Sequence, residues 1–372
     1  MNTRVLGLEE KLDWMQLIRS ENIGPLTFYH LLNHYGNATA ALEAAPELAW
    51  RGGKRHPLQL ESRSKIEKEL ENATKQGIEI IALPEPSYPP LLRSLDDAPP
   101  LLLVYGNKHL LLKDSVAIVG ARNASAGARR LAEDLARDLS SHGLIVISGL
   151  ARGIDTMAHN GSLKGGTIAV LAGGVDVIYP KENTDLYGHI RQKGVLVSEM
   201  PLGTEPLARY FPRRNRIISG CALGVIVVEA ALRSGSLITA RLALEQGRDV
   251  FAIPGSPLDP RSRGTNNLIR NGAMLAESAQ DIITALEPMR ESPLESPTLD
   301  MKSGETCPAP DISDKDRALI VDLLSTTPVE IDELTRQSGL DVATVMVTLL
   351  EMELAGRLVR EPGQKVCLSV EN

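Results

Sequence analysis

Six apolar runs in the middle of the chain constrain its fold more than any other feature. They are separated by stretches with helical spacing, such as "AGARRLAEDLARDLSSHG" and "SLITARLALEQG". The runs are "VAIVG", "LIVISG", "TIAVLAG", "GVLVSE", "GVIVVEA" and "DVFAIPG". Because they are nearly continuous rather than alternating, they are typical of parallel strands buried on both faces of a sheet. The pattern predicts an α/β fold with a Rossmann-like, doubly wound parallel sheet, whose binding crevice lies at the carboxyl ends of the strands.

The remainder of the 372 residues divides around this sheet. Residues 1–80 have the spacing of short amphipathic helices and predict a small helical domain. The turn "ENIGP" could bind a phosphate through its backbone N–H groups, but a simple helical hairpin is the favoured interpretation. Residues 81–287 contain the sheet, and residues 288–312 form a linker rich in Pro, Ser and acidic groups. Residues 313–372 show three helices and a terminal hairpin, which together predict a winged helix.

Charge is distributed unevenly between these parts. The whole chain has a net charge of −7, yet residues 111–290 contain 21 basic and 17 acidic groups, a net of +4. Residues 291–372 contain 7 basic and 16 acidic groups, a net of −9. An anionic partner would therefore meet the middle of the chain rather than its ends.

Other features of the composition point to a cytoplasmic protein without cofactors. The cysteines Cys221, Cys307 and Cys367 are scattered and odd in number, which predicts neither a disulfide framework nor a zinc site. No segment approaches the ~18 consecutive apolar residues of a membrane helix. The start "MNTRVLGLEEKLDW" lacks the apolar region of a signal peptide.

The first strand and its loop, "VAIVGARNASAGARR", resemble a dinucleotide-binding turn but lack its spacing. Gly120 stands at the first glycine position, whereas Arg122 occupies the place of the second glycine, which normally lets the backbone approach a pyrophosphate. The second strand ends in "VISGLARG" without the acidic residue that would hold a ribose. Nicotinamide binding is therefore not expected. An arginine at a strand-to-helix turn still suits a phosphate through bidentate hydrogen bonds.

The second loop, "ISGLARGIDTMAHNGSL", repeats this anion-binding chemistry with Ser148, Gly149 and Arg152. Asp155 and His159 lie four residues apart on one helical face, but no third metal ligand has a suitable spacing. We expect Asp155 to buttress the loop and His159 to form hydrogen bonds behind it. The spacing also disfavours a catalytic triad of Ser148, Asp155 and His159.

Further cationic or amide-rich groups follow other strands. The stretch "FPRRNRIIS" is the most basic of these, and for a generic stretch of this kind a solvated turn would be the ordinary interpretation. "RSGSLITAR" begins a helix whose first N–H groups can bind an anion. Taken together, these strand-end loops predict an extended phosphate-binding surface that includes Lys181, Arg213, Arg214, Asn215, Arg216, Ser234, Gly235 and Ser236.

These motifs, together with "VIYPKEN" and "GTNNLIRNGA", resemble the DNA-processing protein A family (DprA, also called Smf), most specifically from Tyr88 to Leu286. The resemblance implies a protein that binds single-stranded DNA without cutting it and hands it to the RecA recombinase during natural transformation. It also implies that Arg122, Lys181 and Arg214 contact DNA, with Arg216 close by. A homodimer through the Rossmann domain is implied as well, for which the sequence offers Leu268, Ile269, Met274, Leu275, Ile282 and Ile283.

Two other classes of protein fit the sequence less well. A nucleotide phosphoribohydrolase resembling the Lonely Guy proteins would need a P-G-G-x-G-T-x-x-E loop that is not present, and Glu229 precedes the "RSGSLIT" helix instead of following it. A winged-helix transcription factor would need a recognition helix with residues that read base edges. The corresponding segment, "DVATVMVTLLEMELAG", contains no Lys, Arg, Asn or Gln. We therefore expect the winged helix to be a protein-interaction or regulatory module.

Overall fold

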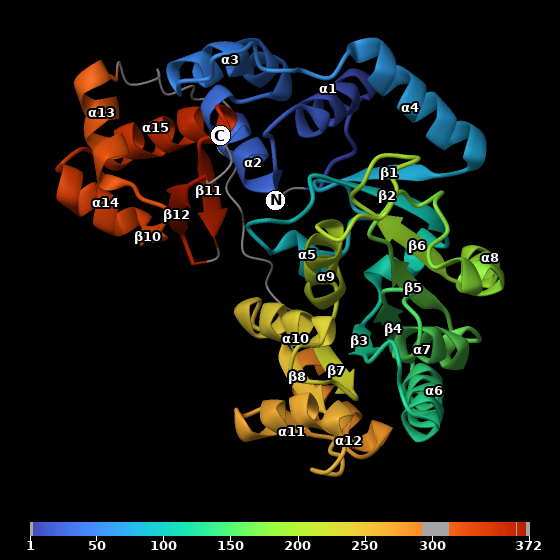
Figure 1. Cartoon of the computed structure of the whole chain (residues 1–372). Helices are drawn as coiled ribbons and strands as arrows, with labels where there is room; N and C mark the ends of the chain where they lie inside the picture. Colours follow the sequence, from blue (N-terminus) through green and yellow to red (C-terminus); the bar gives the residue numbers. More distant parts are fainter. Residues whose placement is uncertain (1–2, 292–311, 362, 370–372) are drawn as a thin grey trace. The chain divides into compact units, whose positions relative to one another are not determined.

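The computed structural model describes residues 3–291, 312–361 and 363–369 (Figure 1). The chain forms two compact units. One contains residues 1–5 and 69–299, and the other contains residues 6–68 and 300–372. Most of the linker expected at residues 288–312 lies outside the described residues, but its first residues continue a helix that ends at Glu291.

The first unit is built on one nine-stranded sheet, in the order β1-β2-β6-β5-β4-β3-β7-β8-β9. The seven neighbouring strands β6, β5, β4, β3, β7, β8 and β9 pair in parallel. Strands β1 and β2 are antiparallel additions at the β6 edge. Their bounds are β1 (Glu79–Ala82), β2 (Leu101–Gly106), β3 (Ser115–Gly120), β4 (Ile145–Ser148), β5 (Thr167–Val170), β6 (Val195–Ser198), β7 (Gly224–Val228), β8 (Asp249–Ala252) and β9 (Met274–Leu275).

Helices cover both faces of this sheet, as the continuous apolar runs predict. Every residue of β4, β5, β6 and β7 is buried. The helices of this unit are α5 (Pro90–Arg93), α6 (Ala126–Ser141), α7 (Ile154–Ser162), α8 (Thr184–Lys193), α9 (Tyr210–Gly220), α10 (Gly235–Glu245), α11 (Arg263–Arg270) and α12 (Ala279–Glu291), with short 3₁₀ turns η1 (Lys108–Leu112), η2 (Lys181–Asn183) and η3 (Pro260–Ser262). This confirms the doubly wound, Rossmann-like fold.

The order of the strands reverses between β3 and β7. From β3 the chain winds outward through β4, β5 and β6, and it then returns to place β7 on the other side of β3. In doubly wound sheets such a reversal opens a crevice at the carboxyl ends of the two central strands. Gly120 pairs with Val228 there, and a Cβ atom on Gly120 would lie only 1.9 Å from the Val228 carbonyl oxygen. The glycine is therefore required by the close approach of the two strands.

The second unit contains a helical part at its N-terminal end. Its helices are α1 (Leu8–Arg19), α2 (Pro25–Tyr35) and α3 (Ala38–Arg51), and α4 (Arg63–Gln76) follows in the sequence. Trp14 and Phe28 are both buried and meet edge to face, with ring centroids 4.9 Å apart. Pro25 begins α2 at a position where a helix N–H needs no partner, and α1 and α2 form the expected hairpin.

The same unit contains the expected winged helix. Its helices are α13 (Asp314–Leu323), α14 (Ile331–Ser338) and α15 (Val342–Leu354), and its sheet has the antiparallel order β10-β12-β11. The strands are β10 (Val329–Glu330), β11 (Leu358–Glu361) and β12 (Lys365–Leu368). An apolar core around Ile320, Leu334 and Val366 holds the three helices on the sheet. Among the described residues, no helix is both long enough and apolar enough to cross a membrane.

Candidate functional site

The arginine-rich stretch forms the first two turns of helix α9 and is not a solvated turn. Pro212 is tolerated because it lies in the first turn, where N–H groups have no partner within the helix. Arg213 and Arg216 are three residues apart and both reach Glu199 at the end of β6. Arg216 is buried and also donates to the carbonyl oxygen of Asp97. We therefore assign Arg216 to the packing of α9 rather than to a surface that a ligand could reach.

Arg214 points away from this pair, toward the ends of β4 and β5. Its side chain is almost fully buried, and its Nη1 donates to the carbonyl oxygen of Val170 at 3.1 Å. Gly149 makes room for it, because a Cβ atom there would lie 1.5 Å from Nη1. The Nε of Arg214 has no hydrogen-bond partner among the residues that the structure describes. A buried cation thus keeps an unused donor beside the loop that follows β4.

Burial lowers the pKa of Arg214 to about 10, while the nearby carboxylate of Asp155 opposes this shift and Arg122 adds to it. The guanidinium therefore stays charged at neutral pH. No direct ion pair joins Asp155 to Arg214, and one oxygen of Asp155 instead accepts from the backbone N–H groups of Gly149 and Ala151, each at 3.2 Å. A buried charge without a direct counter-ion is costly, and an anionic ligand would offset that cost.

The loop after β4 is held rigidly by side chains beneath it. His159 accepts from the N–H of Leu150 through Nε2 at 3.3 Å, and its Nδ1 lies 2.8 Å from the hydroxyl of Thr167. Burial lowers the pKa of His159 to about 3, with a further contribution from the charge of Arg214. The ring is therefore neutral at neutral pH. The expectation that Asp155 buttresses the loop and that His159 forms hydrogen bonds behind it is confirmed.

The contacts of Ser148 argue against a catalytic triad in this loop. Its hydroxyl is fully buried and donates to the carbonyl oxygen of Ile118 at 2.7 Å, so it stabilises the strand end. His159 is engaged with Leu150 and Thr167, and Asp155 with the loop backbone. A nucleophile would need its base within hydrogen-bond reach and the base oriented by the acid. Ser148 is thus a structural residue.

Arg122 is exposed at the end of β3 and lies over an aromatic ring. Its guanidinium carbon is 5.2 Å from the ring centroid of Phe211, and that of Arg214 is 5.8 Å from the same centroid. Tyr179 meets Phe211 edge to face at 6.0 Å. Phe211 therefore gathers two arginines and a tyrosine from three separate segments, and each cation–π contact supports the position of a guanidinium.

In the sequence, Lys181 lies between two residues that are each anchored to another segment. Tyr179 contacts Phe211, and Asn183 donates to the carbonyl oxygen of Leu150 at 2.9 Å. Lys181 itself is exposed, and among the described residues no carboxylate forms an ion pair with it. We call Arg122, Lys181, Phe211 and Arg214 the strand-end cluster. It contains two exposed cations, Arg122 and Lys181, and one buried cation, Arg214.

Arg152 and Arg213 flank the strand-end cluster, and each meets a carboxylate. Arg152 pairs with Glu182, and both side chains are exposed. Arg213 has a looser contact, with its Nε 3.4 Å from Glu199. The Arg152–Glu182 pair is exposed on both sides, and such pairs contribute little free energy, about 0–1 kcal/mol, so an incoming phosphate could replace Glu182, whereas Glu199 is buried. Asn215 is buried beside Arg214 in the sequence and has little surface to offer a ligand.

The start of α10 lies at the carboxyl end of β7, on the other side of the switch point. Ser234 caps its own helix, since its hydroxyl accepts from the N–H of Ser236 at 3.4 Å and lies 2.7 Å from the Ser236 hydroxyl. Gly235 is exposed. Between α10 and the start of α6 stands Glu229, which accepts from the N–H and the hydroxyl of Ser125 at 2.8 and 2.6 Å. The hydrogen bonds of Ser234 and Ser236 described here are local to this helix start and do not involve the strand-end cluster.

Sequence reasoning missed three residues that decide which cations are available. Glu199 engages Arg213 and Arg216, Glu182 engages Arg152, and Asn183 anchors the segment that carries Lys181. Only the motif "YPKEN" placed two of these next to a cation in the sequence. Among the described residues, no group of three His, Cys, Asp or Glu side chains could hold a metal ion.

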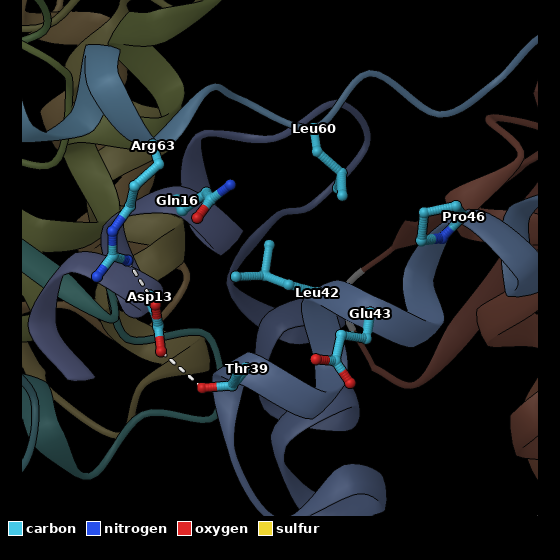
Figure 2. Close-up of a pocket in the computed structure, with 8 residues that line it drawn as sticks. All are labelled: Asp13, Gln16, Thr39, Leu42, Glu43, Pro46, Leu60 and Arg63. Carbon is cyan, nitrogen blue, oxygen red and sulfur yellow. Dashed lines mark hydrogen bonds and ion pairs between the residues drawn. The ribbon is translucent and has the colours of Figure 1, made fainter. Parts of the chain in front are cut away.

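A separate hollow lies in the helical part of the second unit, and Figure 2 shows the side chains that line it. Its volume is about 510 Å³. Its floor is apolar, and its polar side chains include the carboxylates of Asp13 and Glu43. Its arginine, Arg63, is already paired with Asp13 and Glu9, and Asp13 also accepts from Thr39 at 2.6 Å. This hollow offers an anion no unengaged cation and is not a counterpart of the strand-end cluster.

The strand order, the switch point and the cations beside it define a Rossmann-fold protein with a cationic site at the carboxyl ends of its strands. A family model described as DNA recombination-mediator protein A matches residues 79–287. Models of a DprA-like N-terminal HHH domain and a DprA winged helix domain match residues 8–72 and 305–364. The chain belongs to the DNA-processing protein A (DprA/Smf) family.

Individual relatives agree with this assignment. Protein Smf of Escherichia coli is 42% identical over 288 residues, which cover 76% of this chain and 75% of the relative. DprA of Bacillus subtilis is 45% identical over 225 residues, or 60% and 76% of the two chains. The crystal structure of Streptococcus pneumoniae DprA matches with a TM-score of 0.62 at 36% identity, covering 75% of this chain and 98% of that one. Helicobacter pylori DprA, studied for its single-stranded DNA binding mode, matches with a TM-score of 0.53 at 30% identity, covering 58% and 97%.

Proposed function

We propose that this protein binds single-stranded DNA without cutting it, through the strand-end cluster, and that it protects the strand and loads RecA recombinase onto it during natural transformation. The observation that carries the proposal is Arg214, a buried guanidinium with an unused Nε donor that shares the ring of Phe211 with the exposed Arg122. Family membership and the single-stranded DNA binding of the Helicobacter relative support it.

The chemistry of the site favours the sugar–phosphate backbone of a flexible strand over base edges. Arg and Lys side chains neutralise phosphates whatever the base sequence. Few aromatic side chains are available, since aromatic residues make up 3% of the chain. Phe211 is half-buried under Arg122, whereas Tyr179 is 46% exposed and offers one ring on which a base could stack. Electrostatic attraction therefore supplies most of the affinity.

A phosphoribohydrolase is the alternative, and the site gives it little support. Glu229 directly follows β7 at the switch point, and both of its oxygens accept hydrogen bonds from Ser125. It therefore acts as a bridge between the ends of β7 and α6. Incubation with nucleoside monophosphates would distinguish the two functions, because released free base would contradict the proposal of a non-catalytic protein.

A gel-shift comparison of matched single-stranded and double-stranded oligonucleotides tests the proposed function directly. We expect tighter binding of the single strand, similar affinities for different base sequences, and a steep loss of affinity as salt rises. Equal affinity for the two forms, or affinity that does not depend on salt, would contradict the proposal. RecA loading is tested separately by the rate at which RecA assembles on oligonucleotides already coated with a single-strand binding protein.

We further propose a homodimer through the end of the Rossmann unit. Ile282 and Ile283, which the sequence offered for this interface, are buried in the unit's own core and do not contribute. Met274 and Leu275 are 40% and 51% exposed on β9, the strand at the edge of the sheet. An exposed apolar edge strand is suited to pairing with another chain. Light scattering at micromolar concentration should give about twice the 40.2 kDa of one chain.

Deletion of residues 291–372 is expected to leave single-strand affinity within about threefold, ~0.7 kcal/mol. The reason is that the strand-end cluster lies wholly in the Rossmann unit, whereas the deleted residues have a net charge of about −9. The measurement is a gel-shift titration of the truncated and full-length chains side by side. A hundredfold loss, with the oligomeric state unchanged, would place the DNA contacts in the winged helix.

A further inference from the structure

Helix α15 of the winged helix is buried on two sides. Val345, Leu349 and Met352 face the core of the winged helix itself. A second row at helical spacing, formed by Val347, Leu350 and Leu354, lies outside that core yet is only 8%, 3% and 0% exposed. In helix-turn-helix proteins the corresponding recognition helix keeps its outer face free for the major groove. Here that outer face is covered.

The cover is the helical part of the same unit. Helix α15 packs against α3 and α2, and backbone groups at its end are bonded across the contact. The amide Nδ2 of Asn22 donates to the carbonyl oxygen of Leu354 at 3.0 Å, and Nη1 of Arg357 donates to that of Gly52 at 3.1 Å. These bonds satisfy polar groups that would otherwise be buried without partners.

Gly52 marks the closest approach of the two parts. Its φ of −69° and ψ of −3° are open to any residue, so the backbone itself does not require glycine. A Cβ atom at this position would nevertheless lie 1.9 Å from the carbonyl oxygen of Glu351. Ala41, Ala45 and Ala49 precede it at helical spacing on α3, all fully buried. The C-terminal end of α3 is therefore shaped for the backbone of another helix.

The charges around α15 also suit this contact better than DNA. Glu351 is buried and accepts two hydrogen bonds from Arg317, at 2.7 and 2.9 Å. Each of the three cations of the wing contacts another group of the same unit. Arg357 donates to Gly52, Arg360 pairs with Glu353 at 3.0 Å, and Lys365 lies 3.7 Å from Glu330. The contact therefore accounts for the outer apolar row of α15 and for Arg357, whereas Arg360 and Lys365 pair within the winged helix itself.

We propose that α15 is a docking helix whose binding partner is the α2–α3 pair of the same chain. The winged helix would then work as a clamp that joins the two ends of the chain into one module, and not as a reader of nucleic acid. This proposal is independent of the single-stranded DNA site, because none of its residues belongs to the Rossmann unit.

The test uses the full-length protein with a protease site placed between residues 292 and 311. After folding, the linker is cut and the pieces are passed over a gel-filtration column at micromolar concentration. We expect the C-terminal piece to elute with the N-terminal piece. Separation of the wild-type pieces under non-denaturing conditions would overturn the proposal.

A pair of glycine variants makes the test specific to the contact. Gly52→Ala should raise the dissociation constant of the cut pieces by about tenfold or more, the scale of overpacking one buried site. Gly24→Ala is the matched control, because φ at Gly24 is −92° and nothing lies within 4 Å of an added Cβ atom. Equal association of the Gly52→Ala and Gly24→Ala pieces would overturn the proposal.

Binding to duplex DNA gives a second readout on the uncut chains. If α15 is only a docking helix, releasing it in Gly52→Ala should leave duplex affinity within about twofold of the Gly24→Ala control. A gain of tenfold or more would instead identify α15 as a nucleic-acid reader that the contact conceals, and it would overturn the proposal.

Discussion

Removing the three cations of the strand-end cluster is expected to weaken single-strand binding by about 100-fold or more at low salt, ~2.7 kcal/mol. The variant replaces Arg122 and Lys181 by alanine and Arg214 by methionine, which fills the buried space of the guanidinium. Charge-assisted hydrogen bonds are worth about 1.5–3 kcal/mol each, so the loss of three exceeds that figure even when they are not additive. Burial raises the pKa of Asp155 and the charge of Arg214 opposes this shift, so replacing Arg214 removes a stabilising charge from a buried carboxyl, and the stability of the variant is measured alongside its affinity.

The salt dependence of binding identifies the lost interactions as phosphate contacts. Each contact contributes roughly 0.7 to the slope of log K against log salt for a single strand, so the triple variant should lose about 2 from the slope. The loss should be the same for oligonucleotides of different base sequence. The measurement is a fluorescence anisotropy titration at four or five salt concentrations, together with a melting curve to confirm that the variant is folded.

Lys113, Lys164 and Lys193 provide a matched control. They are exposed and precede β3, β5 and β6, so they lie at the amino ends of the strands, opposite the strand-end cluster. Their replacement by alanine removes the same charge from the same sheet. We expect less than a threefold loss of affinity from this control, ~0.7 kcal/mol. Equal losses from both triple variants would show that the protein responds only to overall charge and that the cluster has no special role.

The sheet was predictable because its signal is local. Each of the six central strands is a continuous apolar run, and burial on both faces demands that pattern wherever the strand lies in the sheet. The loops that follow β3 and β4 were predictable for a related reason, since glycine and arginine at a strand end restrict the chemistry available there. The edge strand β9, with two residues, is too short to leave such a signal.

The division of labour among the arginines was not predictable. Arg213, Arg214 and Arg216 are nearly equivalent in the sequence, but the helix turns Arg213 and Arg216 toward Glu199 and sends Arg214 the other way. The contact between Gly149 and Arg214, 65 positions apart, and that between Asn22 and Leu354 arise only once the chain is folded. Long-range partners of this kind leave no trace in local spacing.

The apolar pattern of helix α15 indicates two packing partners but does not identify the second. Its apolar residues form two rows, one ending at Met352 and one at Leu354, and a helix that is apolar on two sides needs two partners. The absence of Lys, Arg, Asn and Gln predicts that this helix does not read the major groove. The identity of the second partner, the α2–α3 pair, required the structure.

Gly120→Ala is expected to destabilise the Rossmann unit by about 3 kcal/mol, the upper range of overpacking penalties. The new Cβ atom would lie 1.9 Å from the Val228 carbonyl oxygen and 2.6 Å from Cγ1 of Ile154. The first of these is backbone in the adjacent strand, and the second belongs to a fully buried side chain. Neither can move aside, so β3 and β7 would have to separate at the switch point. The melting temperature of this unit should fall by roughly 6–12 °C.

Gly127→Ala separates this effect from the general cost of replacing a glycine. Gly127 lies in the first turn of α6, seven residues beyond Gly120, and the nearest atom to an added Cβ is the Ser125 hydroxyl at 4.0 Å. Since alanine restricts the unfolded chain more than glycine does, this control should be stabilised by about 0.5 kcal/mol. The two variants should therefore shift the melting temperature in opposite directions. An unchanged melting temperature for Gly120→Ala would contradict the prediction. It would mean that β3 and β7 lie farther apart than the pairing of Gly120 with Val228 allows.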